Sequence, residues 1–153
     1  MLLIYMFGVW IPNRCKYLNE NTQFRADEGV CGEAVGLNKL EFLKYLHENN
    51  CPWDKYTCDQ AVINNSLSCL KYSVENGCPC DEETCKIAAE NGHLECLKYL
   101  HENNCPWNEK TIIASIKNKH KDCFKYAIDN DCPCDDRIRE IYYQNSNKRA
   151  RIA

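Results

Sequence analysis

Glycine and proline are scarce in this sequence, with 6 and 5 among 153 residues. Their scarcity excludes a collagen-like chain and argues against a disordered one. No charge of one sign dominates either, because 22 acidic residues are set against 19 lysines and arginines, for a net charge of −3. This balance gives no electrostatic basis for binding nucleic acid or an anionic membrane. We therefore expect a folded protein with no nucleic acid and no membrane as partner.

Long hydrophobic runs are also missing. The most apolar stretch, residues 1–12 (MLLIYMFGVWIP), is shorter than the about 20 residues that a membrane-spanning helix needs. It has no basic segment and no small-residue cleavage site, which disfavours a secretory signal. We interpret it as a buried first helix, with a membrane-associating segment as the alternative. Lys148, Arg149 and Arg151 form a small basic tail, either a solvated terminus or a nuclear-import or phosphate contact.

The chain is rich in repetition instead. A Lys-Tyr pair recurs at 27-residue steps from Lys44, and Cys-Pro recurs in the same register from Cys51. The stretch LKYLHENNCPW occurs letter for letter from Leu43 and again from Leu97. Agreement at many positions across four units predicts an array of repeats. We divide the chain into a degenerate N-terminal cap unit, four repeats, a C-terminal cap helix and the basic tail: residues 1–29; 30–56, 57–83, 84–110 and 111–137; 138–146; and 147–153.

Each repeat is predicted to fold as two helices. In the third repeat, Asp81 can cap the first helix, and Asn91-Gly92 is a stop and turn signal. Apolar residues then recur at steps of three and four, which is a helical spacing. Cys105-Pro106 ends the second helix because proline has no N–H to continue it. No alternating strand pattern occurs, so we predict an all-α chain whose helix pairs bury their apolar sides against neighbouring pairs.

The third repeat resembles an ankyrin repeat. Ala88–Asn108 is similar to the family's Ala-Ala, Gly-His turn and apolar second helix, and Thr84 resembles its first-helix threonine. The units have 27 residues rather than about 33, which leaves no room for the family's β-hairpin fingers. Together with the Leu-Lys-Tyr helix and the Cys-Pro-Trp loop, this length resembles the short ankyrin-type repeats of giant DNA viruses of amoebae. The resemblance implies a helical solenoid of stacked antiparallel helix pairs that binds a protein and is not an enzyme.

Cysteine is unusually frequent, with 13 residues. Most fall into three sets at 27-residue steps: Cys31, Cys58 and Cys85; Cys69, Cys96 and Cys123; and Cys51, Cys78, Cys105 and Cys132. Equivalent positions of stacked helices lie about 8–10 Å apart, beyond the about 7 Å between Cα atoms that a disulfide allows. Disulfides between different sets, such as Cys85 with Cys96, stay open. We expect structural thiols and a reducing intracellular compartment.

Metal binding and catalysis receive little support from the spacing. Four residues have the donor types of a zinc site: Cys78, Cys80, Cys85 and His93. Cys85 and His93 would lie at opposite ends of one helix, about 12 Å apart. The histidines recur in two structural roles, at the turn and on the second helices: His93 and His120, and His47 and His101. No unique Cys–His pair remains for nucleophilic catalysis, so we expect no catalytic residue, no metal and no cofactor.

Partner contacts are expected where the repeats differ. Loop and early first-helix positions vary most between the units, and in ankyrin relatives this edge lines the concave side. The predicted contacts are Tyr56, Asp59, Glu83, Lys86, Lys110 and Ile113. The alternative is that these residues are only solvated. Trp53 and Trp107 are interpreted as packing between units, with a role as interface anchors as the alternative.

The favoured function is a non-enzymatic adaptor, a monomeric intracellular module for protein–protein interaction. If the chain is viral, its partner is expected to be a host protein. A structural or virion-associated repeat protein without a dedicated partner is the main alternative. A zinc or redox module is the third and least favoured hypothesis.

Overall fold

The computed structural model of the chain describes residues 28–150, and among them the side chains of residues 30–144. Every regular element in this part of the chain is an α-helix, and no strand occurs there. The predicted all-α class is therefore confirmed for the described residues. None of the helices in residues 28–150 is both long and apolar enough to cross a membrane. The predicted helix at residues 1–12 and nearly all of the N-terminal cap unit lie outside the described residues.

Each of the four repeats contributes two helices, and each first helix begins two residues before the repeat boundary given above. The first helices are α3 (Glu28–Gly36), α5 (Lys55–Ile63), α7 (Glu82–Asn91) and α9 (Glu109–Lys117). The second helices are α4 (Leu40–Glu48), α6 (Leu67–Glu75), α8 (Leu94–Glu102) and α10 (Lys121–Asp129). A last helix, α11 (Asp136–Ala150), is longer at both ends than the predicted cap helix of residues 138–146. It also takes in the first residues of the predicted basic tail.

Side-chain caps fix where the first helices begin. In three of them, a side-chain oxygen accepts a hydrogen bond from the N–H of the second helical residue: Asp54 from Tyr56 at 2.9 Å, Asp81 from Glu83 at 3.0 Å and Asn108 from Lys110 at 3.0 Å. Asp81 also accepts from the N–H of Thr84, whose hydroxyl accepts from the Asp81 N–H, so this end is a capping box. Each cap satisfies an open backbone donor and stabilises its helix by about 1 kcal/mol. The cap predicted at Asp81 is confirmed.

The second helices all end in the same way. The side-chain amide of an asparagine donates to the carbonyl oxygen of the tyrosine four residues earlier, at 2.8 Å in each case: Asn49, Asn76, Asn103 and Asn130. The next residue has a positive φ: Asn50, Gly77, Asn104 and Asp131. These residue types tolerate the left-handed region better than most others. The chain therefore turns out of the helix just before the Cys-Pro step.

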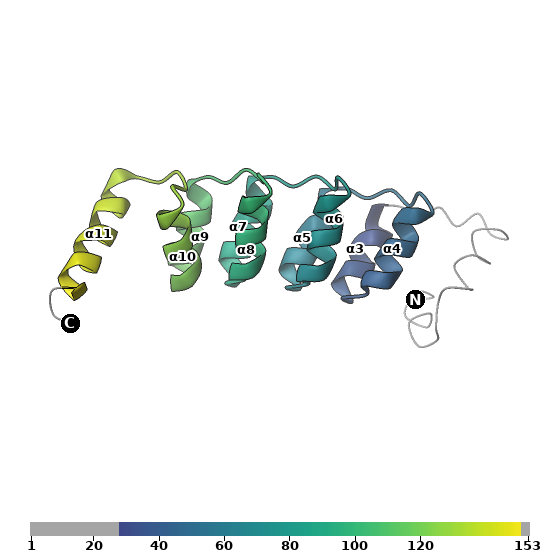
Figure 1. The fold of residues 1–153 in the computed structure, drawn as a ribbon, viewed down its shortest axis with the longest axis horizontal. Coiled ribbons are helices and arrows are strands. Elements are labelled where there is room, and N and C mark those ends of the chain that lie inside the picture. Colours follow the sequence, from purple (N-terminus) through teal and green to yellow (C-terminus); the bar gives the residue numbers. More distant parts are fainter. Residues whose placement is uncertain (1–27, 151–153) are drawn as a thin grey trace. The chain divides into compact units, whose positions relative to one another are not determined.

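The chain divides into two compact units between Pro79 and Cys80. In the first unit, α3 packs against α5 and α4 packs against α6, and each first helix packs on the second helix of its own repeat (Figure 1). Its core consists of apolar side chains with no exposed surface from all four helices, among them Val35, Leu43, Val62 and Leu70. Each repeat thus completes its core with its neighbour.

The second unit repeats this arrangement. Helix α7 packs against α9, α8 packs against α10, and α9 and α10 lie side by side (Figure 1). Ala88 and Ala89, the Ala-Ala pair of the ankyrin-like stretch, are completely buried. At the C-terminal end, a buried cluster of Ile112, Ala127, Ile128 and Cys132 is covered in part by residues of α11 and of the preceding loops, among them Ile138, Tyr142 and Trp107.

Candidate functional site

The six predicted contact residues occupy two equivalent positions of the first helices. The second position holds Tyr56, Glu83 and Lys110, and the fifth holds Asp59, Lys86 and Ile113. Residues three apart lie on the same side of a helix. The buried residues of these helices begin at the third and fourth positions, as with Thr57 and Cys58 in α5. Each predicted pair therefore lies on the side of its helix that faces away from the core.

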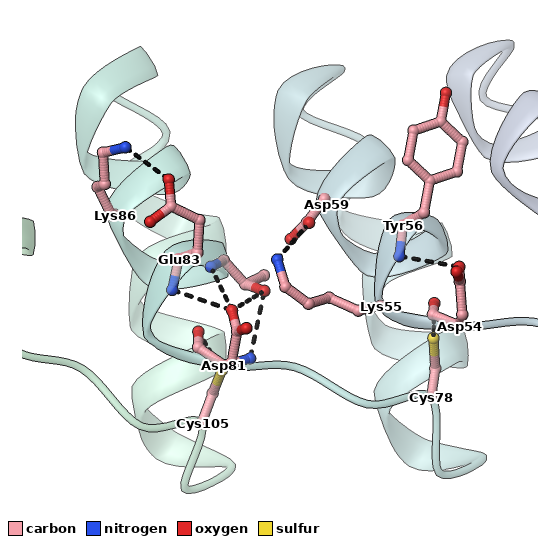
Figure 2. Close-up of polar contacts among 10 residues, drawn as sticks. Asp54, Lys55, Tyr56, Asp59, Cys78, Asp81, Glu83, Lys86 and Cys105 are labelled. Carbon is pink, nitrogen blue, oxygen red and sulfur yellow. Dashed lines mark hydrogen bonds and ion pairs between the residues drawn. The ribbon is translucent and has the colours of Figure 1, made fainter.

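In the first unit, Tyr56 and Asp59 differ in accessibility. Tyr56 is 47% exposed, and its ring lies over Gly32, where an added Cβ would come within 2.6 Å of a ring carbon. Asp59 forms an ion pair with Lys55 at 2.7 Å, and its side chain is only 15% exposed (Figure 2). Tyr56 offers an aromatic surface, whereas a partner would reach Asp59 only in part.

In the second unit, α7 presents a group of charges. Lys86 is hydrogen-bonded to Glu83 (Figure 2) and lies 3.9 Å from a carboxylate oxygen of Glu90. The hydrogen bond with Glu83 raises the pKa of Lys86, so this side chain is a cation at neutral pH. Glu82 and Glu90 are exposed beside this pair. The outward side of α7 is therefore acidic, with one lysine among three glutamates.

Helix α9 of the same unit has a different surface. Lys110 is exposed, and its backbone N–H bonds the cap Asn108. Ile113 is 51% exposed, although it is a large apolar residue. Exposed apolar residues that cluster with polar neighbours are a common feature of protein-binding surfaces. The equivalent positions thus differ in chemistry: α5 carries an aromatic ring, α7 carries an acidic group, and α9 carries an apolar residue beside a cation.

The cysteines form a second repeated feature, inside the units. Every cysteine of the described residues is a thiol, so the disulfide left open between Cys85 and Cys96 does not form. Thiols of the first helices approach the Cys-Pro loops of their own repeats instead: Cys31 donates to the Cys51 sulfur at 3.3 Å, and Cys58 and Cys85 donate to the carbonyl oxygens of Cys78 and Cys105 at 3.9 Å. The loop thiols in turn reach back to the helix cap of the preceding first helix: Cys78 to the Asp54 carbonyl at 3.1 Å (Figure 2), Cys105 to that of Asp81 at 3.5 Å and Cys132 to that of Asn108 at 3.3 Å.

The buried thiols of the first helices, the second helices and the loops are poor nucleophiles. Burial raises the pKa of Cys96 and of Cys123 to about 11, and that of Cys132 to about 12. A hydrogen bond with Cys85, followed by burial, raises the pKa of Cys105 still further. Since the thiolate is the reactive form, burial keeps these sulfurs inert and leaves them as small apolar core groups.

Two aromatic clusters occur with nearly the same geometry. In the first unit, the rings of His47 and Trp53 stack with centroids 3.9 Å apart, and His47 Nδ1 lies 3.0 Å from the Tyr72 hydroxyl. In the second unit, the same arrangement joins His101, Trp107 and Tyr126, with a centroid separation of 4.0 Å and an Nδ1 to hydroxyl distance of 3.0 Å. Each cluster takes its tyrosine from the following repeat. Packing between repeats, the favoured interpretation of the tryptophans, is therefore confirmed within each unit.

Sequence reasoning missed the part that histidine plays in these clusters. The signal was present, because the two repeats that carry Trp53 and Trp107 also carry His47 and His101. The other two repeats have neither residue at these two positions, with Val74 and Cys80 in one and Ile128 and Cys134 in the other. Paired gain and loss of two residues at fixed register indicates direct contact.

The turn histidines have a packing role. The His120 ring covers Gly92, where an added Cβ would come within 2.5 Å of His120 Nδ1. Burial, with a smaller contribution from neighbouring His120, lowers the pKa of His93. Neither His93 nor His120 caps its helix through its side chain. The two imidazoles thus pack near each other at successive turns of the second unit.

Two further kinds of site were considered, a metal site and a groove. Among the described residues, no group of three or more histidine, cysteine, aspartate or glutamate side chains is arranged to hold a metal ion. In the first unit a groove of about 390 Å³ runs between α4 and α6, lined by residues that include Leu40, Lys44, Leu67 and Tyr72. Lys44 is already paired with Glu41 at 2.9 Å.

Comparison with known proteins adds no relative. No protein-family model matches the chain, and no curated protein is similar to it.

Proposed function

We propose that this protein is a non-enzymatic protein–protein interaction module, an adaptor built as a solenoid of ankyrin-like repeats. The observation that supports it is the contrast between constant and variable positions of the first helices. The third position is Thr57, Thr84 or Thr111, always buried, whereas the second position is Tyr56, Glu83 or Lys110 on the outward side. A scaffold that holds its core constant while it changes exposed chemistry is suited to recognising a protein surface.

The chemistry of the reactive residue types supports a binding role over a catalytic one. The cysteines are mostly buried with raised pKa values, as for Cys96, and a buried thiol is a weak nucleophile. His47 and His101 each have one face of the imidazole covered by a tryptophan and Nδ1 3.0 Å from a tyrosine hydroxyl, so both rings are part of a packed cluster. These thiols also suit a reducing, intracellular setting, which we include in the proposal together with a monomeric chain.

The test compares two sets of alanine substitutions in the full chain. Tyr56→Ala, Lys86→Ala and Ile113→Ala remove predicted contacts. Ser68→Ala, Glu95→Ala and Lys125→Ala are matched controls on exposed positions of the second helices. Affinity capture from the native cells, followed by quantitative mass spectrometry, should recover a specific partner with the wild type and the control set. With the contact set, the amount of partner recovered should fall at least about tenfold, while the melting temperature stays within about 2 °C of that of the wild type. Undiminished capture by the contact set would refute the surface.

A structural or virion-associated role without a dedicated partner is the second candidate. The two aromatic clusters and the thiol contacts favour it, because they make a rigid scaffold without requiring a ligand. A wild-type chain that captures no specific protein, yet is found in purified particles or assemblies, would support this role. Stoichiometric zinc in protein purified under reducing conditions would overturn both candidates in favour of a metal module.

A further inference from the structure

The turn between α9 and α10, with the sequence KNKHK at residues 117–121, departs from the other repeats. The equivalent turns read GLNKL, INNSL and ENGHL, with one lysine at most. Lys117, Lys119 and Lys121 are all exposed. Within the part of the chain that the structure describes, none of the three forms an ion pair. This turn therefore concentrates positive charge that no carboxylate of the described residues neutralises.

Local stability does not account for two of these lysines. Lys119 has a φ of 62° at the position where the other repeats carry Asn38, Asn65 and Gly92. Asparagine and glycine adopt this left-handed conformation more readily than lysine does. Lys121 is the first residue of α10, where the other three repeats have leucine, and a cation there opposes the positive end of the helix dipole. Residues that go against a local conformational or electrostatic preference, without a contact that compensates for the lost stability, are typical of functional positions.

Two isoleucines lie on the same part of α9. Ile113 is 51% exposed and Ile116 is 46% exposed. With Lys117 they follow the spacing of three and four residues that places side chains on one side of a helix. The equivalents of Ile116 in the other repeats, Val35, Val62 and Ala89, have no exposed surface. We call this surface the lysine–isoleucine edge, and it consists of Ile113, Ile116, Lys117, Lys119 and Lys121.

We propose that the lysine–isoleucine edge binds an acidic, amphipathic segment of a partner protein. This inference rests on the proposed protein-binding function and adds the partner's chemistry and its position on the fold. The segment would carry apolar side chains that cover Ile113 and Ile116, next to carboxylates that pair with the three lysines. Charge complementarity of this kind mainly sets specificity and association rate, while the buried apolar contact supplies affinity.

The neighbouring helix argues against a polyanion at this edge. Helix α7 packs against α9 in the same unit, and its outward side carries Glu82, Glu83 and Glu90 beside the single Lys86. A nucleic acid or an anionic membrane would extend over these carboxylates and be repelled. Glu82 and Glu83 lie in the first turn of α7, whereas Glu90 occupies the position equivalent to Lys117 and lies 3.9 Å from Lys86. A short peptide segment can reach Lys119 and Lys121 in the turn without covering Glu82 and Glu83. The net charge of −3 points the same way.

Selection from a random-peptide phage library on the immobilised full chain tests the proposal. The selected peptides are expected to be enriched in aspartate, glutamate and apolar residues. Synthetic copies should bind Lys119→Asn/Lys121→Leu at least about tenfold more weakly than wild type, as measured by fluorescence anisotropy. This variant restores residues of the other repeats, so it should be at least as stable as wild type. The matched control, Lys39→Ser/Lys125→Ala, loses the same charge elsewhere and should bind like wild type.

Neutral or basic selected peptides, or equal binding by both double variants, would overturn the proposal. Tighter binding to a single-stranded RNA probe or to phosphatidylserine vesicles, lost in Lys119→Asn/Lys121→Leu, would overturn it in favour of a polyanion site. Peptides or captured partners that are lost with Tyr56→Ala but not with the edge variant would refute the edge alone and leave the proposed function standing. If neither peptide nor partner binds the wild type, both proposals fail.

Discussion

Trp107 is expected to stabilise the second unit by about 3 kcal/mol, which its replacement by alanine would remove. The ring stacks on His101 at 4.0 Å, meets Tyr126 edge-on at 6.2 Å and packs against the Ile112 cluster. A partly buried tryptophan loses about 1.5 kcal/mol of transfer free energy on truncation. Each of the two aromatic pairs adds about 0.5–1.5 kcal/mol. The total stays at the lower end of the about 3–5 kcal/mol seen for fully buried tryptophans.

Urea denaturation followed by far-UV circular dichroism measures this loss, because the substitution itself removes a fluorophore. Trp53→Ala serves as a replicate, since its stacking distance on His47 is 3.9 Å. Tyr126→Phe removes only the hydroxyl that lies 3.0 Å from His101 Nδ1, and should cost about 1 kcal/mol. Tyr56→Phe is the matched control, because that ring is 47% exposed and its hydroxyl makes no hydrogen bond within the described residues.

Two results would refute this account of the cluster. Losses below about 1 kcal/mol for both Trp53→Ala and Trp107→Ala would show that the stacked rings contribute little beyond filling surface. Equal changes for Tyr126→Phe and Tyr56→Phe would show that the contact between histidine and tyrosine contributes nothing to stability.

Gly92→Ala should destabilise the protein more than Gly77→Ala in thermal denaturation. Both glycines have positive φ, which costs about 1 kcal/mol for alanine, but only at Gly92 would the new Cβ come within 2.5 Å of His120; equal losses would contradict this packing. A short iodoacetamide pulse, read by mass spectrometry, should label the half-buried Cys80 and Cys134 before Cys96, whose pKa is raised to about 11; early labelling of Cys96 would contradict its burial. Stability should fall as the pH drops below about 6.5, because burial and His120 lower the pKa of His93, so the unfolded chain binds the proton more tightly than the folded one. His93→Gln should reduce this slope in urea titrations, and an unchanged slope would show that His93 is not its source.

Local signals made the helices predictable. The cap at Asp81, the stop at Asn91-Gly92 and the break at Pro106 each act within a few residues, so they can be read from the sequence alone. The structure adds what such signals do not state, such as the bond from the Asn103 amide to the Tyr99 carbonyl that closes a second helix. The six predicted contacts were chosen because their positions vary between the repeats. Their outward side could also have been read from the helical period, because it depends only on which residues of the same helix are buried.

Contacts between repeats were harder to foresee. The hydrogen bond between His101 and Tyr126 joins residues 25 positions apart, and the sequence of neither repeat predicts it without the other. The exposure of Ile116 depends on whether another helix covers it. The repeat pattern alone predicts a buried residue, as at Val35, whereas Ile116 is 46% exposed. The pairing of Asp59 with Lys55 limits one predicted contact, although its spacing of four residues on a helix could have revealed it.

The aromatic clusters bear on how such an array can evolve in length. Each cluster needs a histidine and a tryptophan from one repeat but only a tyrosine from the next, and all four repeats carry that tyrosine, at Tyr45, Tyr72, Tyr99 and Tyr126. A duplicated gene segment encoding the histidine and tryptophan would therefore find its missing ring in whichever repeat came to follow it. Insertion by unequal recombination would then need no compensating mutation in the neighbour. The identical stretches that begin at Leu43 and Leu97 are what recent growth by such duplication would leave behind.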